Sequence, residues 1–205
     1  MAFFSASVSL SRYRIMDDVN DQLLREAPER LVKHAFQDID HTADERSFGW
    51  VCADDYLDSK WKASPPEKGH FLIFSLRLDT RRVQPAVFKK HVAIAERSYL
   101  ESIEDPDKRF MPKDRKREIR DQVMLKLRAR ALPVPAVFEA AWDLRTHTVY
   151  LASTNSKVRS LFEDLFTLTF ELALEPLTPF FLASRMLGEE ALPRLESLEP
   201  TDFPG

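Results

Sequence analysis

The chain has 205 residues, 44% of them hydrophobic, and its 30 Lys and Arg against 33 Asp and Glu give a formal net charge of -3. A chain of this kind can bury one large core or two small ones, and no apolar run approaches the roughly 20 residues needed to cross a bilayer. Its single cysteine, Cys52, excludes an internal disulfide framework and a multi-cysteine zinc site, and its four glycines form no Gly-rich phosphate loop. We therefore expect a cytoplasmic globular protein without a bound cofactor.

The first part of the chain is predicted to form strands around one helix. In "FFSASVSLSRYRI", which begins at Phe3, apolar residues alternate with serines, and this is the period of a strand with one buried face. Pro28 is expected to open the helix "PERLVKHAF", because proline fits the first helical position. Two strands rich in aromatic and branched residues follow, "RSFGWVCA" and "HFLIFSLRLDTRRV". The residues expected to face inward from the helix are Leu31, Val32, Ala35 and Phe36.

Two consecutive helices are predicted in the middle of the chain. The first begins at Pro85 and extends to about Glu104, and its apolar residues at helical spacing are Phe88, Val92, Ala95, Tyr99 and Ile103. The second runs from about Pro112 to Ala131 and is ended by the two prolines that follow it.

The last part of the chain predicts a strand pair, "AVFEAAWDL" and "HTVYLAS", and then a helix from about Ser156. Trp50 and Trp142 lie within apolar strands and are expected in the core. The resulting order, β-α-β-β-α-α-β-β-α, predicts an α+β fold with a mostly antiparallel sheet or two linked sheets. Residues 1–183 would form the folded region, as one unit or as linked subdomains 1–104 and 105–183. Residues 184–205, rich in Glu and Pro, would form a loosely held tail.

The second middle helix is strongly basic. Residues 111–133 contain eight Lys and Arg in 23 positions. At 100° per residue, a stripe about 80° wide contains Lys113, Arg117, Arg120, Met124 and Arg128. It adjoins the apolar stripe that would face the core, formed by Ile119, Val123, Leu127 and Ala131. An unneutralised row of this kind can follow a phosphate backbone and release its counterions. A second basic group surrounds the preceding strand end, with Arg77, Arg81, Arg82, Lys89 and Lys90.

Three interpretations of the basic helix are compatible with the sequence. It can bind nucleic acid, or it can be a solvated face whose cations pair with acids elsewhere, or it can dock on an acidic protein partner. A metal-dependent nuclease is a further alternative, because Asp107, Asp114 and Lys116 imitate the Pro-Asp and Asp-x-Lys elements of one nuclease signature. That signature usually lies on adjacent strands, whereas Asp114 falls in the first turn of a predicted helix. We therefore assign no catalytic residue and no metal site.

The ordered features together resemble the RdgC family of bacterial recombination-associated proteins, over about residues 3–183. The resemblance rests on the Ser-rich opening strand, "FGWV" from Phe48, "RRVQPAVFKKHV", the basic "KDRKREIRDQVMLKLRARALP", and "WDLRTHTVYLAS" followed by "KVRSLFEDLF". It implies a protein that binds double-stranded DNA without sequence preference and acts in replication and recombination, where it restrains RecA-promoted strand exchange. It also implies a ring-shaped homodimer with a basic hole, and an association with the nucleoid.

Three arginines of this chain fall at positions that match DNA-binding segments of the family. Arg109 falls in the basic segment ahead of the helix, and Arg128 and Arg130 fall in the turn that lies near DNA in the family. Two features differ: Leu132 stands near the place of the family's aromatic residue, and relatives of usual length continue past this chain. A shorter dimer, a clamp and a truncated relic are therefore alternatives to a closed ring. Single-stranded DNA is a second possible partner. The predicted DNA contacts are Arg109, Lys113, Arg117, Arg120, Arg128, Arg130, Arg77, Arg81 and Arg82.

Overall fold

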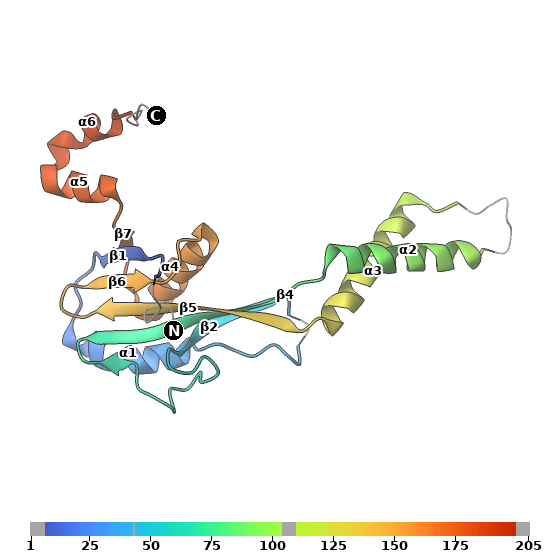
Figure 1. The fold of residues 1–205 in the computed structure, drawn as a ribbon, viewed down its shortest axis with the longest axis horizontal. Helices are drawn as coiled ribbons and strands as arrows, with labels where there is room; N and C mark the ends of the chain where they lie inside the picture. The colour runs from blue at the N-terminus through green and yellow to red at the C-terminus, as the bar shows by residue number, and fades with distance from the viewer. Residues whose placement is uncertain (1–6, 43, 104–109, 200–205) are drawn as a thin grey trace. The chain divides into compact units, whose positions relative to one another are not determined.

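The computed structural model describes residues 7–42, 44–103 and 110–199 (Figure 1). The chain divides into two compact units. The first comprises residues 1–35, 50–76 and 138–205, and the second comprises residues 36–49 and 77–137. Each unit is therefore assembled from separate stretches of the chain, which the strands connect.

The structure is an α+β fold, as predicted. Its sheet has the strand order β2-β4-β5-β6-β1-β7, and β3 pairs with β4 outside this path. Strand β1 pairs antiparallel with β6 and β7, and the β5/β6 and β3/β4 pairs are antiparallel as well. The strands are β1 (Ser11–Ile15), β2 (Arg46–Cys52), β3 (Glu67–Lys68), β4 (Phe71–Arg81), β5 (Pro133–Asp143), β6 (Thr148–Leu151) and β7 (Leu174–Pro176).

Strand β1 is shorter than the serine alternation predicted. It covers Ser11–Ile15, and Tyr13 and Ile15 point into the core from alternate positions. Residues 7–10 form no strand, and the beginning of the predicted strand lies outside the described residues. The alternation of apolar and polar residues therefore predicted the strand correctly only where large side chains are buried in the core.

Helix α1 (Asp21–Lys33) begins well before the predicted position. The prediction that Pro28 opens the helix is wrong, because Pro28 lies inside it. The start is made by Asn20, whose side chain accepts a hydrogen bond from the Leu23 amide at 2.8 Å and so caps the first turn. A proline in a helix interior removes one backbone hydrogen bond. Here the helix persists, with Ala27 and Leu31 buried on either side of that position.

The core of the first unit lies between α1, α4 (Ser156–Phe170) and one face of the sheet. Trp50 and Trp142 are fully buried, as predicted. Trp50 meets Phe74 edge to face at 5.0 Å between ring centroids, and Trp142 meets Phe170 at 5.3 Å. The indole Nε1 of Trp50 donates to the Thr169 hydroxyl at 2.7 Å. Ring pairs of this geometry add to the energy of apolar burial and fix the helices against the sheet.

The buried phenol of Tyr13 makes the stability of this core depend on pH. Burial raises the pKa of Tyr13 to about 12, although Arg159 Nε donates to its hydroxyl at 3.2 Å. The unfolded chain ionises first, near the usual pKa of about 10, so the stabilising effect is full below about pH 10 and is lost as the pH rises toward 12.

We expect Tyr13→Phe to remove that pH-dependent component. Between about pH 9 and about pH 11.5 the wild-type free energy of unfolding should fall by up to about 2 kcal/mol more than that of the variant. Urea titrations at each pH measure this difference, and ionisation of the other tyrosines and lysines cancels because both proteins share it. A constant difference across the range would contradict the assignment.

The chain after β7 forms further helices, and the last of them lie within residues 184–205, the segment predicted to be a loosely held tail. Helix α5 (Pro179–Leu187) begins at Thr178, whose hydroxyl accepts from the Phe181 amide at 3.1 Å. It ends at Gly188, which has φ 81°. A 3-10 turn (Glu189–Ala191) and helix α6 (Leu192–Glu196) follow. Across the described part of the chain, no helix combines the length and the apolar character required of a membrane span.

The second unit contains a helical hairpin made by α2 (Pro85–Glu101) and α3 (Lys113–Arg130), labelled in Figure 1. Both helices begin and end close to the predicted positions, with Pro85 in the first turn of α2. Their buried seam contains Val92 from α2 and Ile119 and Val123 from α3. The partly buried residues around it are Phe88, Ala95, Tyr99, Met111 and Leu127.

Candidate nucleic-acid interface

The positive charge of the chain is concentrated in residues 77–137, the longer of the two stretches that form the second unit. Residues 77–137 contain 16 Lys and Arg against nine Asp and Glu, although the whole chain has a net charge of -3. The remaining 144 residues are therefore acidic on balance. A local excess of one sign governs the attraction of a charged partner more than the total does.

The seam between α2 and α3 determines which cations of α3 point outward. Ile119 and Val123 are buried against Val92, as the helical period predicted. Since side chains four positions apart lie on the same face, Lys113 and Arg117 must lie together beside this apolar stripe. Both are exposed.

Some cations of α3 have partners in the hairpin itself. Arg115 donates to Glu118 at 2.7 Å, and its guanidinium lies 5.1 Å from the centre of the Tyr99 ring. Lys116 lies 3.7 Å from Glu96 of α2. These contacts hold α3 against α2. Because the two cations are already paired with carboxylates, they attract an anionic ligand less strongly.

Three exposed cations, Lys113, Arg117 and Arg120, form the outer row of α3. Within the described part of the chain, none of them has a carboxylate at ion-pair distance. The guanidinium of Arg120 lies 5.6 Å from the centre of the Phe88 ring, and this contact orients the arginine without neutralising its charge. The outer row extends along about 10 Å of helix axis, because each residue advances the helix by about 1.5 Å.

Arg128, at the end of the same stripe, is paired. Its Nη2 lies 3.0 Å from the carboxylate of Glu45, and the two side chains are 39% and 56% exposed. The sequence offered no signal for this pair, since the residues are far apart in the chain. Arg130 is exposed, and so is Lys126, a cation that lies on another face of α3, outside the predicted basic stripe.

Arg77 has a structural role in the second unit. Its guanidinium donates to both carboxylate oxygens of Asp79, at 2.8 and 2.7 Å, and lies 4.2 Å from the centre of the Phe36 ring. The Arg77 and Asp79 side chains are only 11% and 4% exposed. A buried pair of this kind is not available to a phosphate, so we remove Arg77 from the predicted DNA contacts.

Arg81 is buried as well, and it joins two segments of the backbone. Its Nη2 donates to the carbonyls of Ile39 at 2.6 Å, Asp40 at 3.1 Å and Thr42 at 3.0 Å. Its Nη1 donates to the carbonyl of Ala131 and approaches that of Arg128, and so satisfies acceptors at the end of α3. We therefore also remove Arg81 from the predicted contacts.

The other two predicted DNA contacts are Arg82 and Arg109, and only Arg82 lies within the described residues. Arg82, next in the chain to Arg81, is exposed. Arg109 lies outside the described residues. The turn after α3 presents Leu132, which is 80% exposed, at the place where the family resemblance would put an aromatic residue.

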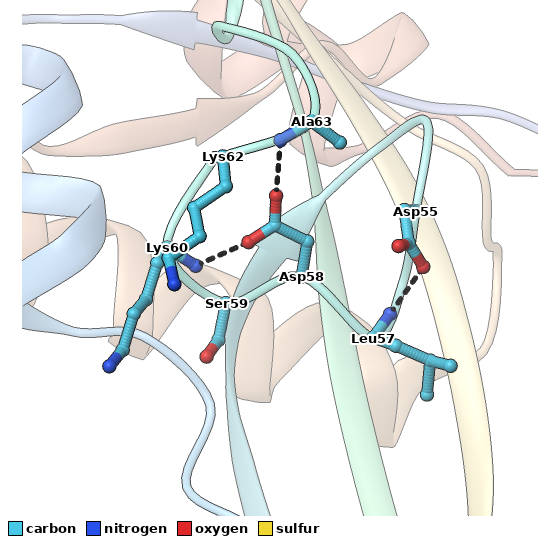
Figure 2. Close-up of a pocket in the computed structure, with 7 residues that line it drawn as sticks. All are labelled: Asp55, Leu57, Asp58, Ser59, Lys60, Lys62 and Ala63. Atoms are coloured by element: carbon cyan, nitrogen blue, oxygen red, sulfur yellow. Dashed lines mark hydrogen bonds between the residues drawn. The ribbon is translucent and has the colours of Figure 1, made fainter.

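The loop of residues 55–63 lines a separate open surface pocket of about 580 Å³ in the first unit (Figure 2). Figure 2 shows that its carboxylates are bound by the loop's own backbone. Asp58 accepts from the amides of Ala63 at 2.8 Å and Lys60 at 2.9 Å, and Asp55 accepts from that of Leu57 at 2.9 Å. The backbone hydrogen bond from Ala63 is the main reason that the pKa of Asp58 is lowered. These carboxylates stabilise the loop.

Among the residues that the structure describes, no group of three or more His, Cys, Asp and Glu is arranged to hold a metal ion. Asp114 is exposed in the first turn of α3, and Lys116 contacts Glu96. Asp107, the other carboxylate of the alternative nuclease motif, lies outside the described residues.

A comparison with protein-family models matches residues 8–187 to the family described as "Putative exonuclease, RdgC". The chain belongs to the RdgC family. The match covers nearly all of the region over which the sequence resembles that family, including the α2–α3 hairpin and its basic outer row. A search of curated proteins found no significant match. Membership of the RdgC family fits a recombination-associated role.

Proposed function

We propose that this RdgC-family chain binds double-stranded DNA without sequence preference, through the second unit. The observation that carries the proposal is the outer row of α3, where Lys113, Arg117 and Arg120 are exposed with no carboxylate partner among the described residues. Arg82 and Arg130 are further exposed cations of the same unit. Arg128 joins them when a phosphate replaces Glu45.

The row supports a phosphate-binding mechanism. Each cation that neutralises a phosphate releases condensed counterions, and the entropy of their release drives association. Phosphate contacts orient the protein on DNA but read no base sequence. The proposed interaction is therefore general and dependent on salt. In recombination and replication it would restrain RecA-type strand exchange by occupying duplex backbone that the exchange machinery must also contact.

The family resemblance supports two further parts of the proposal. Two copies of the chain assemble as a homodimer, and the protein associates with the nucleoid because general DNA binding retains it there. The exposed Leu132 is aliphatic, so it would contact DNA without stacking a ring on the bases. Mass measurement in solution, with and without DNA, tests the dimer.

A duplex titration at several salt concentrations tests the proposed function. We expect similar affinities for unrelated sequences, and a plot of log affinity against log salt with a slope of about -2.7 or steeper, since the outer row alone neutralises three phosphates. Fluorescence anisotropy with labelled duplexes measures both quantities, and a single-stranded probe of the same length compares the two partners. A slope near zero or strong discrimination between sequences would overturn the proposal.

A metal-dependent exonuclease is the second candidate, favoured by the family description. End-labelled duplex incubated with protein and Mg²⁺ or Mn²⁺ tests it. Loss of label that disappears in Asp114→Asn would support the nuclease and assign Asp114 to it. Label that remains intact while the same sample binds duplex would favour binding without catalysis.

A further inference from the structure

The second unit contains a cavity of about 420 Å³ at the beginning of α2. It lies between the last residue of β4, the first residues of α2 and the basic stripe of α3, at Met124 and Arg128. Its lining includes Glu45, Arg81, Arg82, Gln84, Met124 and Arg128. Three arginines thus line one cavity, against one carboxylate.

The three arginines of this cavity are in different states. Arg81 is 5% exposed and lies fixed by backbone carbonyls, and its buried Nε has no hydrogen-bond partner among the described residues. Arg82 is exposed and has no ion pair within the described chain. Arg128 is held by Glu45 at 3.0 Å. The net charge of the lining is positive even with Glu45 in place.

The beginning of α2 adds to this positive potential. Gln84, the N-cap residue, makes no hydrogen bond from its side chain to the first turn, and Pro85 occupies the first helical position. Uncapped amide groups at a helix start carry partial positive charge and favour anions. The helix start and the arginines therefore favour the same class of ligand.

We propose that this cavity is a phosphate seat in which the Glu45 carboxylate is a resident oxyanion that phosphate displaces from Arg128. The inference deepens the proposed function and rests on it where the phosphate belongs to DNA. A carboxylate at 3.0 Å from Arg128 already demonstrates that an oxyanion fits against this guanidinium. Both members of the pair are partly exposed, so the pair is weak and can exchange. A phosphate can accept bidentate hydrogen bonds from Arg128 and can lie at ion-pair distance from Arg82. It therefore replaces the Glu45 carboxylate with an anion that these arginines bind more strongly.

The direct test is Glu45→Gln, which keeps the shape of the side chain and removes its charge. We expect duplex affinity to rise by up to about fivefold, which is the upper end of what an exposed ion pair is worth, and the salt slope to steepen by about 1. The matched control is Glu118→Gln, which makes the same charge change and also frees an arginine, Arg115, on α3 but outside the cavity. Equal effects of the two variants would overturn the seat.

Arg82→Gln is the second substitution of a double-mutant cycle that measures the coupling between Glu45 and Arg82 in duplex affinity. Combined with Glu45→Gln, it should cancel most of the gain, because the phosphate bound at the freed Arg128 then lacks the second of its two cations. Additive effects of the two changes would mean that Glu45 and Arg82 serve no common ligand and would contradict the proposal.

Inorganic pyrophosphate distinguishes a DNA phosphate from a free one. At constant ionic strength set with NaCl, it should raise the thermal midpoint of Glu45→Gln more than that of Glu45→Gln/Arg82→Gln if the seat also accepts free phosphates. A response to duplex alone assigns the seat to the DNA backbone.

If wild type binds no duplex, the proposed function fails, and the pyrophosphate experiment alone decides whether the seat exists. If wild type binds duplex but neither probe distinguishes Glu45→Gln from Glu118→Gln, the seat fails and the proposed function remains.

Discussion

Replacing Lys113, Arg117 and Arg120 together with glutamine is expected to weaken duplex binding about a hundredfold at ~0.1 M salt. Three phosphates would lose their counter-charges, and the salt slope should become shallower by about 2.7. Glutamine is a good helix former and retains the aliphatic part of the side chain, so α3 should stay folded. Anisotropy titrations at several salt concentrations, on two unrelated duplexes, measure the affinity and the slope.

The control for this variant changes three exposed cations of the first unit, Arg12, Arg14 and Lys157, to glutamine. It alters the net charge of the protein by the same amount at positions outside the hairpin. We expect a much smaller change in affinity. If both triple variants lose affinity equally, only net charge matters and the outer row is not the interface. If neither does, α3 does not bind DNA.

Replacing Arg81 with alanine is expected to destabilise the fold by more than about 3 kcal/mol. The guanidinium donates to carbonyls of Ile39, Asp40, Thr42 and Ala131, and its removal leaves one buried and several partly buried acceptors without a donor. The end of α3 and the segment before β2 should loosen together. Urea unfolding followed by circular dichroism measures the free energy of unfolding.

Arg82→Ala is the matched control for this change, because Arg82 is adjacent in sequence and exposed. A surface substitution of this kind should change stability by no more than about 0.5 kcal/mol. Arg81→Lys should fall between the two, since a lysine can reach fewer carbonyls. An Arg81→Ala protein that is as stable as wild type but binds duplex poorly would return Arg81 to the DNA contacts and contradict its structural role.

The contrast between Arg81 and Arg82 illustrates what sequence patterns cannot resolve. Arg77, Arg81 and Arg82 look alike in the sequence, as a basic cluster at a strand end. In the fold, Arg77 and Arg81 are buried with partners, while Arg82 is exposed. The partners of Arg81 lie in two segments remote from it in the chain, and no local pattern predicts which carbonyls a buried guanidinium will reach.

The same limit explains the error at Pro28. Proline is compatible with a first helical turn, and this local preference alone placed the helix start there. The actual start depends on the Asn20 cap, and the helix continues through Pro28 because Ala27 and Leu31 bury against the core of the first unit. Packing energy outweighed the lost backbone hydrogen bond, and packing is not visible in a local window.

The sequence by itself determined the α+β class, the approximate bounds of α2 and α3, the apolar stripe of α3 and the family. These follow from periodicity, proline positions and short motifs, which act over a few neighbouring residues. Only the tertiary structure decided which arginines remain free, that Glu45 holds Arg128, and that the two units are built from interleaved stretches of the chain. Those features depend on groups brought together from distant positions, and charge pairing and burial are set by that proximity rather than by order along the chain.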